Sequence, residues 1–142
     1  MDVSELRKRI LRALDDARKE AGARRAMHDE AARAYDAFLE QVAVPLFRQA
    51  VIVLKTEGHL FTVYAPAGSA RLVSAKSPET FIELVLDTSG PQPEVLGRVS
   101  VARGREGRVD ERPLAPGTSI ADLTDDDVSQ FLVRAIPTLT LR

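Results

Sequence analysis

The sequence predicts an α+β fold with a long N-terminal helical arm, an antiparallel sheet meander of four or five strands, and a C-terminal helix packed on the sheet. Apolar residues recur every three or four positions up to Thr56, which is the period of one helix face. From Leu60 to Leu114 the period is two, and short turn sequences interrupt it, which is typical of strands joined by hairpins. The helical period then returns once, near the C-terminus.

The segment Ser4–Gln41 is predicted to be helical because it has no proline, only one glycine, and many Ala, Leu, Arg, Glu and Lys residues. Ser4 is a suitable N-cap. The apolar positions form a single stripe on an otherwise charged helix. They are Leu6, Ile10, Leu14, Ala17, Ala21, Met27, Ala31, Ala34, Tyr35, Phe38, Leu39 and Val42.

Such a helix would be roughly 57 Å long, whereas a domain of this size is about 30 Å across. It therefore either projects as an arm or folds back as a hairpin, and Gly22 is the one internal position for a bend. We favour a continuous helix, because a glycine in a helix interior costs about 1 kcal/mol but does not by itself break the helix.

Pro45 predicts a kink or restart, since proline suits the first turn of a helix and is poor inside one. A second helix is expected over Pro45–Thr56, with Gly58 as its C-terminal cap. This divides the chain into an arm, residues 1–44, and an α+β domain, residues 45–142. The inward residues of the second helix are predicted to be Leu46, Phe47, Ala50, Val51 and Leu54.

The strands are expected to form an antiparallel meander, because their connections are too short for parallel crossovers. Pro66–Ser69 and Gly104–Gly107 are the predicted turns of two of these connections. The predicted strands are Leu60–Ala65, Ala70–Ala75, Thr80–Thr88, Glu94–Arg103 and Arg108–Leu114.

A last helix is predicted over Asp125–Ile136, capped by Thr124 and ended by Pro137, with the tail 138–142 adding a short strand or fraying. Its apolar face is formed by Val128, Phe131, Leu132, Ala135 and Ile136. Both short helices should pack on one sheet face. The residues expected beneath them are Ile82, Leu84, Leu86, Val99 and Val101.

The composition excludes several classes of site. The chain has no cysteine, so disulfides, thiolate metal sites and cysteine nucleophiles are excluded. Its net charge of −1 gives no overall attraction to nucleic acid or anionic membrane. No apolar run suits a signal peptide, and the longest, Ala50–Leu54, is far short of the about 20 residues of a membrane span. We therefore expect a cytoplasmic protein that does not enter a membrane.

The residues most suited to chemistry have simpler structural explanations. Asp125–Asp127 are contiguous, so they lack the spacing of a calcium loop and instead complement the positive end of a helix. His28 and His59 have no further ligands at zinc-site spacing. No serine lies in a nucleophile elbow. We therefore expect a protein that is not an enzyme and that binds no cofactor or metal.

Arginines of the fourth and fifth predicted strands suggest nucleic-acid binding as the alternative function, since a basic sheet face can contact phosphates. Aromatic residues that stack on bases are absent from this stretch, and this makes nucleic acid the weaker alternative. The candidate contacts are Arg98, Arg103, Arg105 and Arg108.

The leading prediction is a non-enzymatic interaction module, an adaptor, chaperone-like protein or regulatory subunit. Aromatics are only 5% of the chain and tryptophan is absent, so the core must be built from smaller side chains that bury less area per residue, and oligomerisation is a natural remedy. The arm's apolar stripe requires cover, and we expect a homodimer or another protein partner to supply it. The expected contact residues are Leu6, Ile10, Leu14, Met27 and Phe38.

Overall fold

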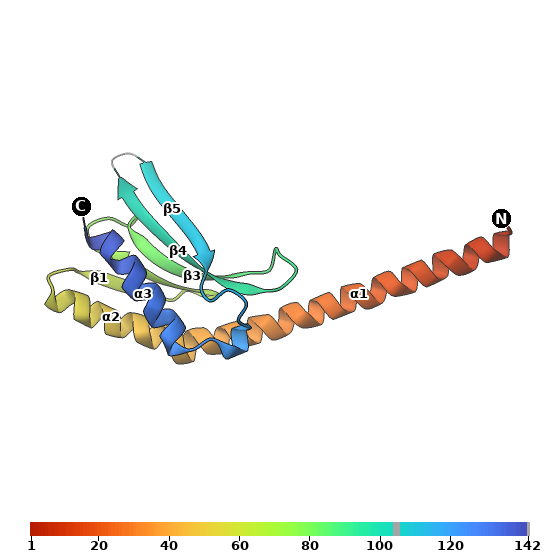
Figure 1. The fold of residues 1–142 in the computed structure, drawn as a ribbon, viewed down its shortest axis with the longest axis horizontal. Coiled ribbons are helices and arrows are strands. Elements are labelled where there is room, and N and C mark those ends of the chain that lie inside the picture. Colours follow the sequence, from red (N-terminus) through yellow and green to blue (C-terminus); the bar gives the residue numbers. More distant parts are fainter. Residues whose placement is uncertain (104–105, 142) are drawn as a thin grey trace.

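The computed structural model describes residues 1–103 and 106–141, and a single long helix dominates it. This helix runs from Val3 to Thr56 and comprises α1 (Val3–Phe38), the π-helical turn η1 (Leu39–Ala43) and α2 (Val44–Thr56). Gly22 lies inside α1 without a break, so the expectation of a continuous helix is confirmed. Figure 1 shows α1 projecting far beyond the rest of the molecule as an arm.

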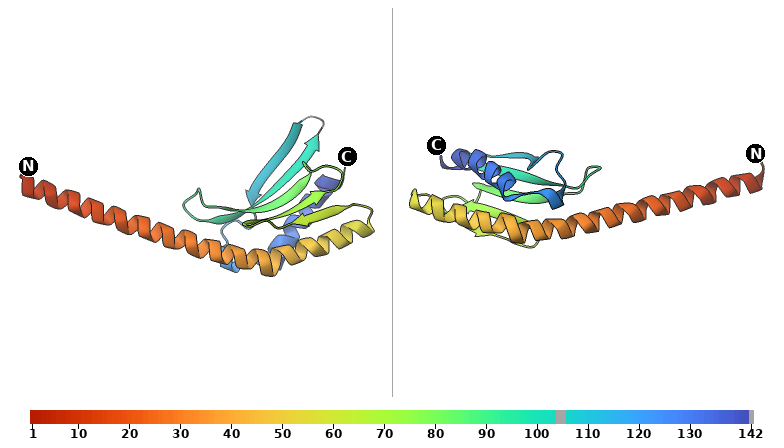
Figure 2. Two further views of the ribbon diagram at one scale, coloured as in Figure 1. Left: turned by 180° about the vertical axis from the view of Figure 1, so that it is seen from behind. Right: turned by 60° about the horizontal axis from the view of Figure 1, so that its bottom comes forward.

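The long helix changes direction where α1 meets α2 (Figure 2). There the amide of Val44 donates to the carbonyl of Leu39, five residues earlier, and Pro45 follows in the first turn of α2. Because proline has no amide hydrogen, one bond of the α-helical ladder is already missing at this point, and the wider π turn accommodates the loss. The predicted kink at Pro45 is therefore a π-helical bend.

The sheet has five antiparallel strands in chain order, so the predicted meander is confirmed. Gly107 belongs to the last strand and pairs with Ala102, while residues 104 and 105 of the predicted turn lie outside the described residues. The strands are β1 (Phe61–Tyr64), β2 (Ser69–Ser74), β3 (Phe81–Asp87), β4 (Glu94–Arg103) and β5 (Glu106–Pro113).

The core lies between one face of the sheet and the two short helices, with α2 against β1 and β2 and α3 (Asp125–Thr140) against β4. The strand register sets Leu72 beside Ile82, and Ile82 beside Val99 on the same face. Of the residues expected to point inward from α2, Phe47 and Leu54 are buried, and the other three are half-buried. The fully enclosed side chains include Tyr35, Phe47, Leu72, Ile82, Leu84 and Val128.

The expectation that Pro137 ends the last helix is wrong, because α3 continues through it to Thr140. Proline removes only the bond to the carbonyl four residues earlier, that of Val133, whose side chain is 72% exposed. On the exposed side of a helix, water can take the place of a lost backbone hydrogen bond. The expected cap is present, since the Thr124 hydroxyl accepts from the Asp127 amide and the Asp127 carboxylate accepts from the Thr124 amide.

By length and composition alone, the helix Val3–Thr56 would be able to cross a membrane. Its more apolar part is α2, where Phe47 and Leu54 pack in the core. A core helix meets the same composition test as a membrane helix, so this finding assigns no location.

Candidate interaction surface of the helical arm

The free part of the arm is residues 3–20, all of which are exposed to solvent. The arm stripe, defined here as Leu6, Ile10 and Leu14, lies on this part with side chains that are 48%, 50% and 48% exposed. Ala21 and Gly22 are the first residues along the helix that are partly covered. The described part of the chain therefore provides no cover for the stripe.

The base of the arm is fixed to the domain by Tyr35. Its side chain is 2% exposed, and its hydroxyl lies 2.9 Å from the carbonyl oxygen of Gly68 and 3.1 Å from that of Leu84. Burial, and secondarily the charges of Glu83 and Asp36, raises the pKa of the Tyr35 phenol above its usual range. The hydroxyl therefore stays protonated and can donate, and α1 leaves the sheet in a fixed direction.

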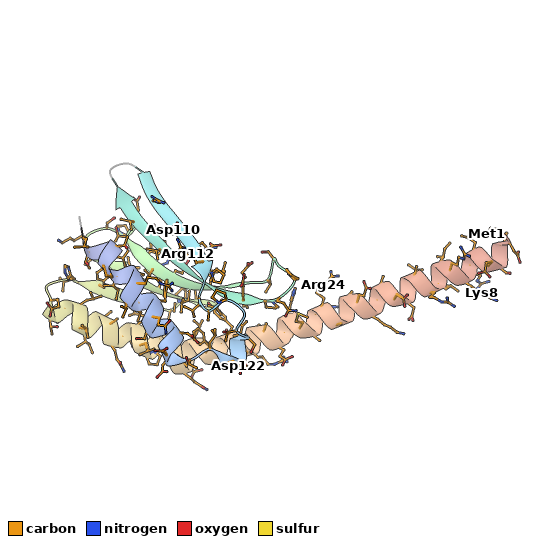
Figure 3. The ribbon with its side chains drawn as sticks, in the orientation of Figure 1. Met1, Lys8, Arg24, Asp110, Arg112 and Asp122 are labelled. Atoms are coloured by element: carbon orange, nitrogen blue, oxygen red, sulfur yellow. The ribbon has the colours of Figure 1, made fainter. Side chains whose placement is uncertain are left out.

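Two adjoining hollows lie along α1 where it reaches the domain, and we call them together the root groove. One, of about 620 Å³, lies between α1 and the loop 88–91, and it includes Glu20, Arg24 and His28. The other, of about 520 Å³, includes Glu30 and Glu94 and is bounded by residues 92–94 and 117–121. Met27 lines both hollows. Figure 3 shows Arg24 beside the loop between β3 and β4.

A heptad seam connects the arm stripe to the root groove. Ten residues follow one another along α1 at alternating steps of three and four, and all except Glu20 and Arg24 are apolar. An apolar 3.5-residue period is that of two helices packed side by side. The seam residues are Val3, Leu6, Ile10, Ala13, Ala17, Glu20, Arg24, Met27, Ala31 and Ala34. The last five of these line the root groove.

Two of the five residues expected to contact a partner are placed differently from the stripe. Met27 is 39% exposed and lies in the root groove. Phe38 is 5% exposed and belongs to the hydrophobic core. Sequence reasoning missed Glu20, Arg24 and Glu30 as groove residues, although the alternating three- and four-residue steps were a signal for Glu20 and Arg24.

No family model, curated protein or solved structure matches the chain.

The candidate nucleic-acid contacts do not come together on one surface. Arg98 pairs with Glu111, and Arg108 pairs with Val101, so the strand alternation sets the two arginines on opposite faces of the sheet. Arg98 is also neutralised locally, since it contacts the carboxylates of Glu83 and Glu111. Arg105 and the side chain of Arg103 lie outside the described residues.

The sheet face opposite the helices carries a charge ladder that we define as Arg71, Glu83, Arg98 and Glu111, which are register partners across four strands. Glu83 is only 6% exposed, and Arg71 Nη2 lies 2.7 Å from its Oε2. The Arg71 guanidinium also lies 4.1 Å from the centre of the Phe81 ring. The charged side chains of the ladder therefore pair with one another.

The remaining candidates for chemistry are dispersed. His28 lies on the arm beside the root groove, and His59 follows α2 at the other end of the domain. Over residues 1–103 and 106–141, no group of three or more His, Asp or Glu side chains is arranged to hold a metal ion. A further hollow of about 820 Å³ extends from His59 to Leu141, and its hydroxyls at Ser74, Ser77 and Thr80 are bonded to backbone of the same chain.

Proposed function

We propose that the protein is a non-enzymatic protein-interaction module, acting as an adaptor, chaperone-like protein or regulatory subunit, whose N-terminal helix binds another protein chain. The observation that supports this most directly is the arm stripe, which is half-exposed on a helix that projects from the domain. Burying the remaining half of each large apolar side chain contributes roughly 1 kcal/mol, and a partner helix would gain this at each position.

The stability of the arm supports the same proposal. Most helical stability in proteins comes from packing of the apolar face. Residues 3–20 have no such packing within the chain. Their ion pairs, Glu5 with Arg9 at 3.5 Å and Asp15 with Lys19 at 3.2 Å, are exposed and contribute little. A partner that covers the stripe would supply the missing packing.

Site-specific photo-crosslinking in cells of the native host tests the proposal. A benzophenone amino acid placed at Ile10 or Leu14 should form a covalent adduct with another chain, identified by peptide mass spectrometry. The matched controls are Lys8 and Arg12, which point away from the stripe on the same turns, and they should give no adduct. Equal yields at all four positions, or none at Ile10 and Leu14, would contradict the proposal.

A further inference from the structure

We propose that the chain bound by the arm is a second copy of this protein, arranged antiparallel, so that the tip of each arm lies in the root groove of the other copy. The tip is defined as residues 3–14. The inference rests on the proposed function, because it identifies the partner of the same surface. Three observations carry it: the spacing of the seam, the area available for contact, and the distribution of charge.

The seam is self-complementary when two copies run antiparallel. If Val3 of one copy meets Ala34 of the other, then Leu6 lies over Ala31, which is 9% exposed and lines the root groove, and Ile10 meets Met27. Large side chains of the tip thus face small or flexible ones of the groove, which is how packed layers interdigitate. The two-fold axis passes between Ala17 and Glu20, and the alanines there allow the helices to approach closely.

The contact area between two helices favours an overlap that reaches from the tip of one arm to the root groove of the other copy. An overlap limited to residues 3–20 is about 27 Å long and, at a helix width of about 10 Å, gives roughly 300 Å² per copy. Stable interfaces bury about 800 Å² per partner, so the free arm alone is too small. An overlap from Val3 to Ala34 is about 48 Å long and gives roughly 500 Å². The walls of the root groove, residues 88–94 and 117–121, add further contact area.

The charges of tip and groove are complementary. The tip carries four basic residues and one acidic residue, Glu5. Arg7 and Arg9 flank the seam, whereas Lys8 and Arg12 point away from it. The hollow around Met27 and Ala31 contains the acidic residues Glu30 and Glu94, and no lysine or arginine is among the residues that line it. In the antiparallel arrangement Arg9 flanks the seam beside Glu30 of the partner copy, the position at which ion pairs set helix orientation.

A charge-exchange experiment tests the arrangement. The tip variant carries Arg7→Glu and Arg9→Glu, and the groove variant carries Glu30→Arg and Glu94→Arg. The unaltered chain should sediment at twice its 15.6 kDa mass. Each variant alone should dimerise at least tenfold more weakly, because like charges meet at both ends. An equimolar mixture should recover the dimer, because both ends of the mixed pair are then complementary.

The control variant carries Lys8→Glu and Arg12→Glu, which changes net charge equally on the side facing away from the seam, and it should still dimerise. A mixture of tip and groove variants that remains monomeric, with circular dichroism showing both folded, would overturn the arrangement. The proposed function would survive that outcome if the unaltered chain dimerises and Ile10→Asp abolishes the dimer. If the unaltered chain is monomeric while Ile10 crosslinks to a different protein, the second copy is ruled out as partner and only the proposed function survives.

Discussion

The aromatic ring of Phe131 lies directly on the backbone of Gly97. A Cβ atom built on Gly97 would stand 2.7 Å from Phe131 Cε1 and 3.0 Å from Cζ, which is closer than real Cβ contacts. Phe131 is 6% exposed and comes from α3, whereas Gly97 lies in the middle of β4. The glycine therefore sets how closely α3 approaches the sheet.

Gly97→Ala should destabilise the protein by about 1–3 kcal/mol, because the added methyl group overpacks the contact between α3 and β4. Urea unfolding followed by circular dichroism measures the change. In a Phe131→Leu background the same substitution should cost less than half as much, since the ring that causes the clash is gone. Gly22→Ala is the control: an added Cβ there meets nothing within 4 Å, so no loss of stability is expected. Equal effects of Gly97→Ala in the two backgrounds would contradict this account.

Tyr35→Phe should lower the free energy of unfolding by about 1–2 kcal/mol, because the buried carbonyl group of Leu84 and the partly buried one of Gly68 lose their hydroxyl donor. The substitution keeps the ring, so the core stays filled. Tyr64→Phe, at a side chain that is 56% exposed, should change stability by less than about 0.5 kcal/mol. A loss at Tyr64→Phe as large as at Tyr35→Phe would be inconsistent with this role.

The same tyrosine predicts a pH dependence. Because folding raises the pKa of Tyr35, the unfolded chain releases the phenol proton at a lower pH than the folded chain. Its contribution to stability is therefore complete below a pH of about 10 and falls by up to about 1.4 kcal/mol per unit above it. Urea unfolding at several alkaline pH values should show a steeper loss for the unaltered chain than for Tyr35→Phe. Parallel curves for the two would refute the prediction.

Glu83→Gln should destabilise the domain by about 1–3 kcal/mol, because it removes the charge-assisted bond to Arg71 and leaves two guanidinium groups facing a neutral amide. Glu111→Gln is the matched control from the same ladder. Its side chain is 43% exposed, so the loss should stay below about 1 kcal/mol. Thermal and urea unfolding of the two variants give the comparison, and a larger effect at Glu111 would disprove the assignment of Glu83 as the buried centre of the ladder.

Thr124→Ala should cost about 1 kcal/mol, because it removes the hydroxyl that accepts from the Asp127 amide at the start of α3. Ser129→Ala, on the exposed side of the same helix, should change stability by less than about 0.5 kcal/mol. The difference between the two is measured by urea unfolding. It should vanish if the capping box contributes nothing to the fold.

The sequence predicted most elements because their signals are local. The 3.5–3.6-residue period of apolar residues predicted the long N-terminal helix and the C-terminal helix. The alternation in Thr80–Thr88 predicted the strand Phe81–Asp87. Pro137 misled because a proline near the end of a helix removes one hydrogen bond, and the exposed side of the helix tolerates that loss.

The sequence by itself determined that an apolar stripe runs along the first helix and that polar and charged residues cover its other sides. It could not distinguish Ile10 from Phe38, because both lie on that stripe with suitable spacing. Only the tertiary structure decided that Phe38 is buried in the core and that Ile10 is half-exposed. Likewise, only the register between β4 and β5 shows that Arg98 and Arg108 lie on opposite faces of the sheet. The physical reason is that a side chain's exposure depends on which segments distant along the chain pack against it. The period of apolar residues shows only which residues lie on the same face of a helix or strand.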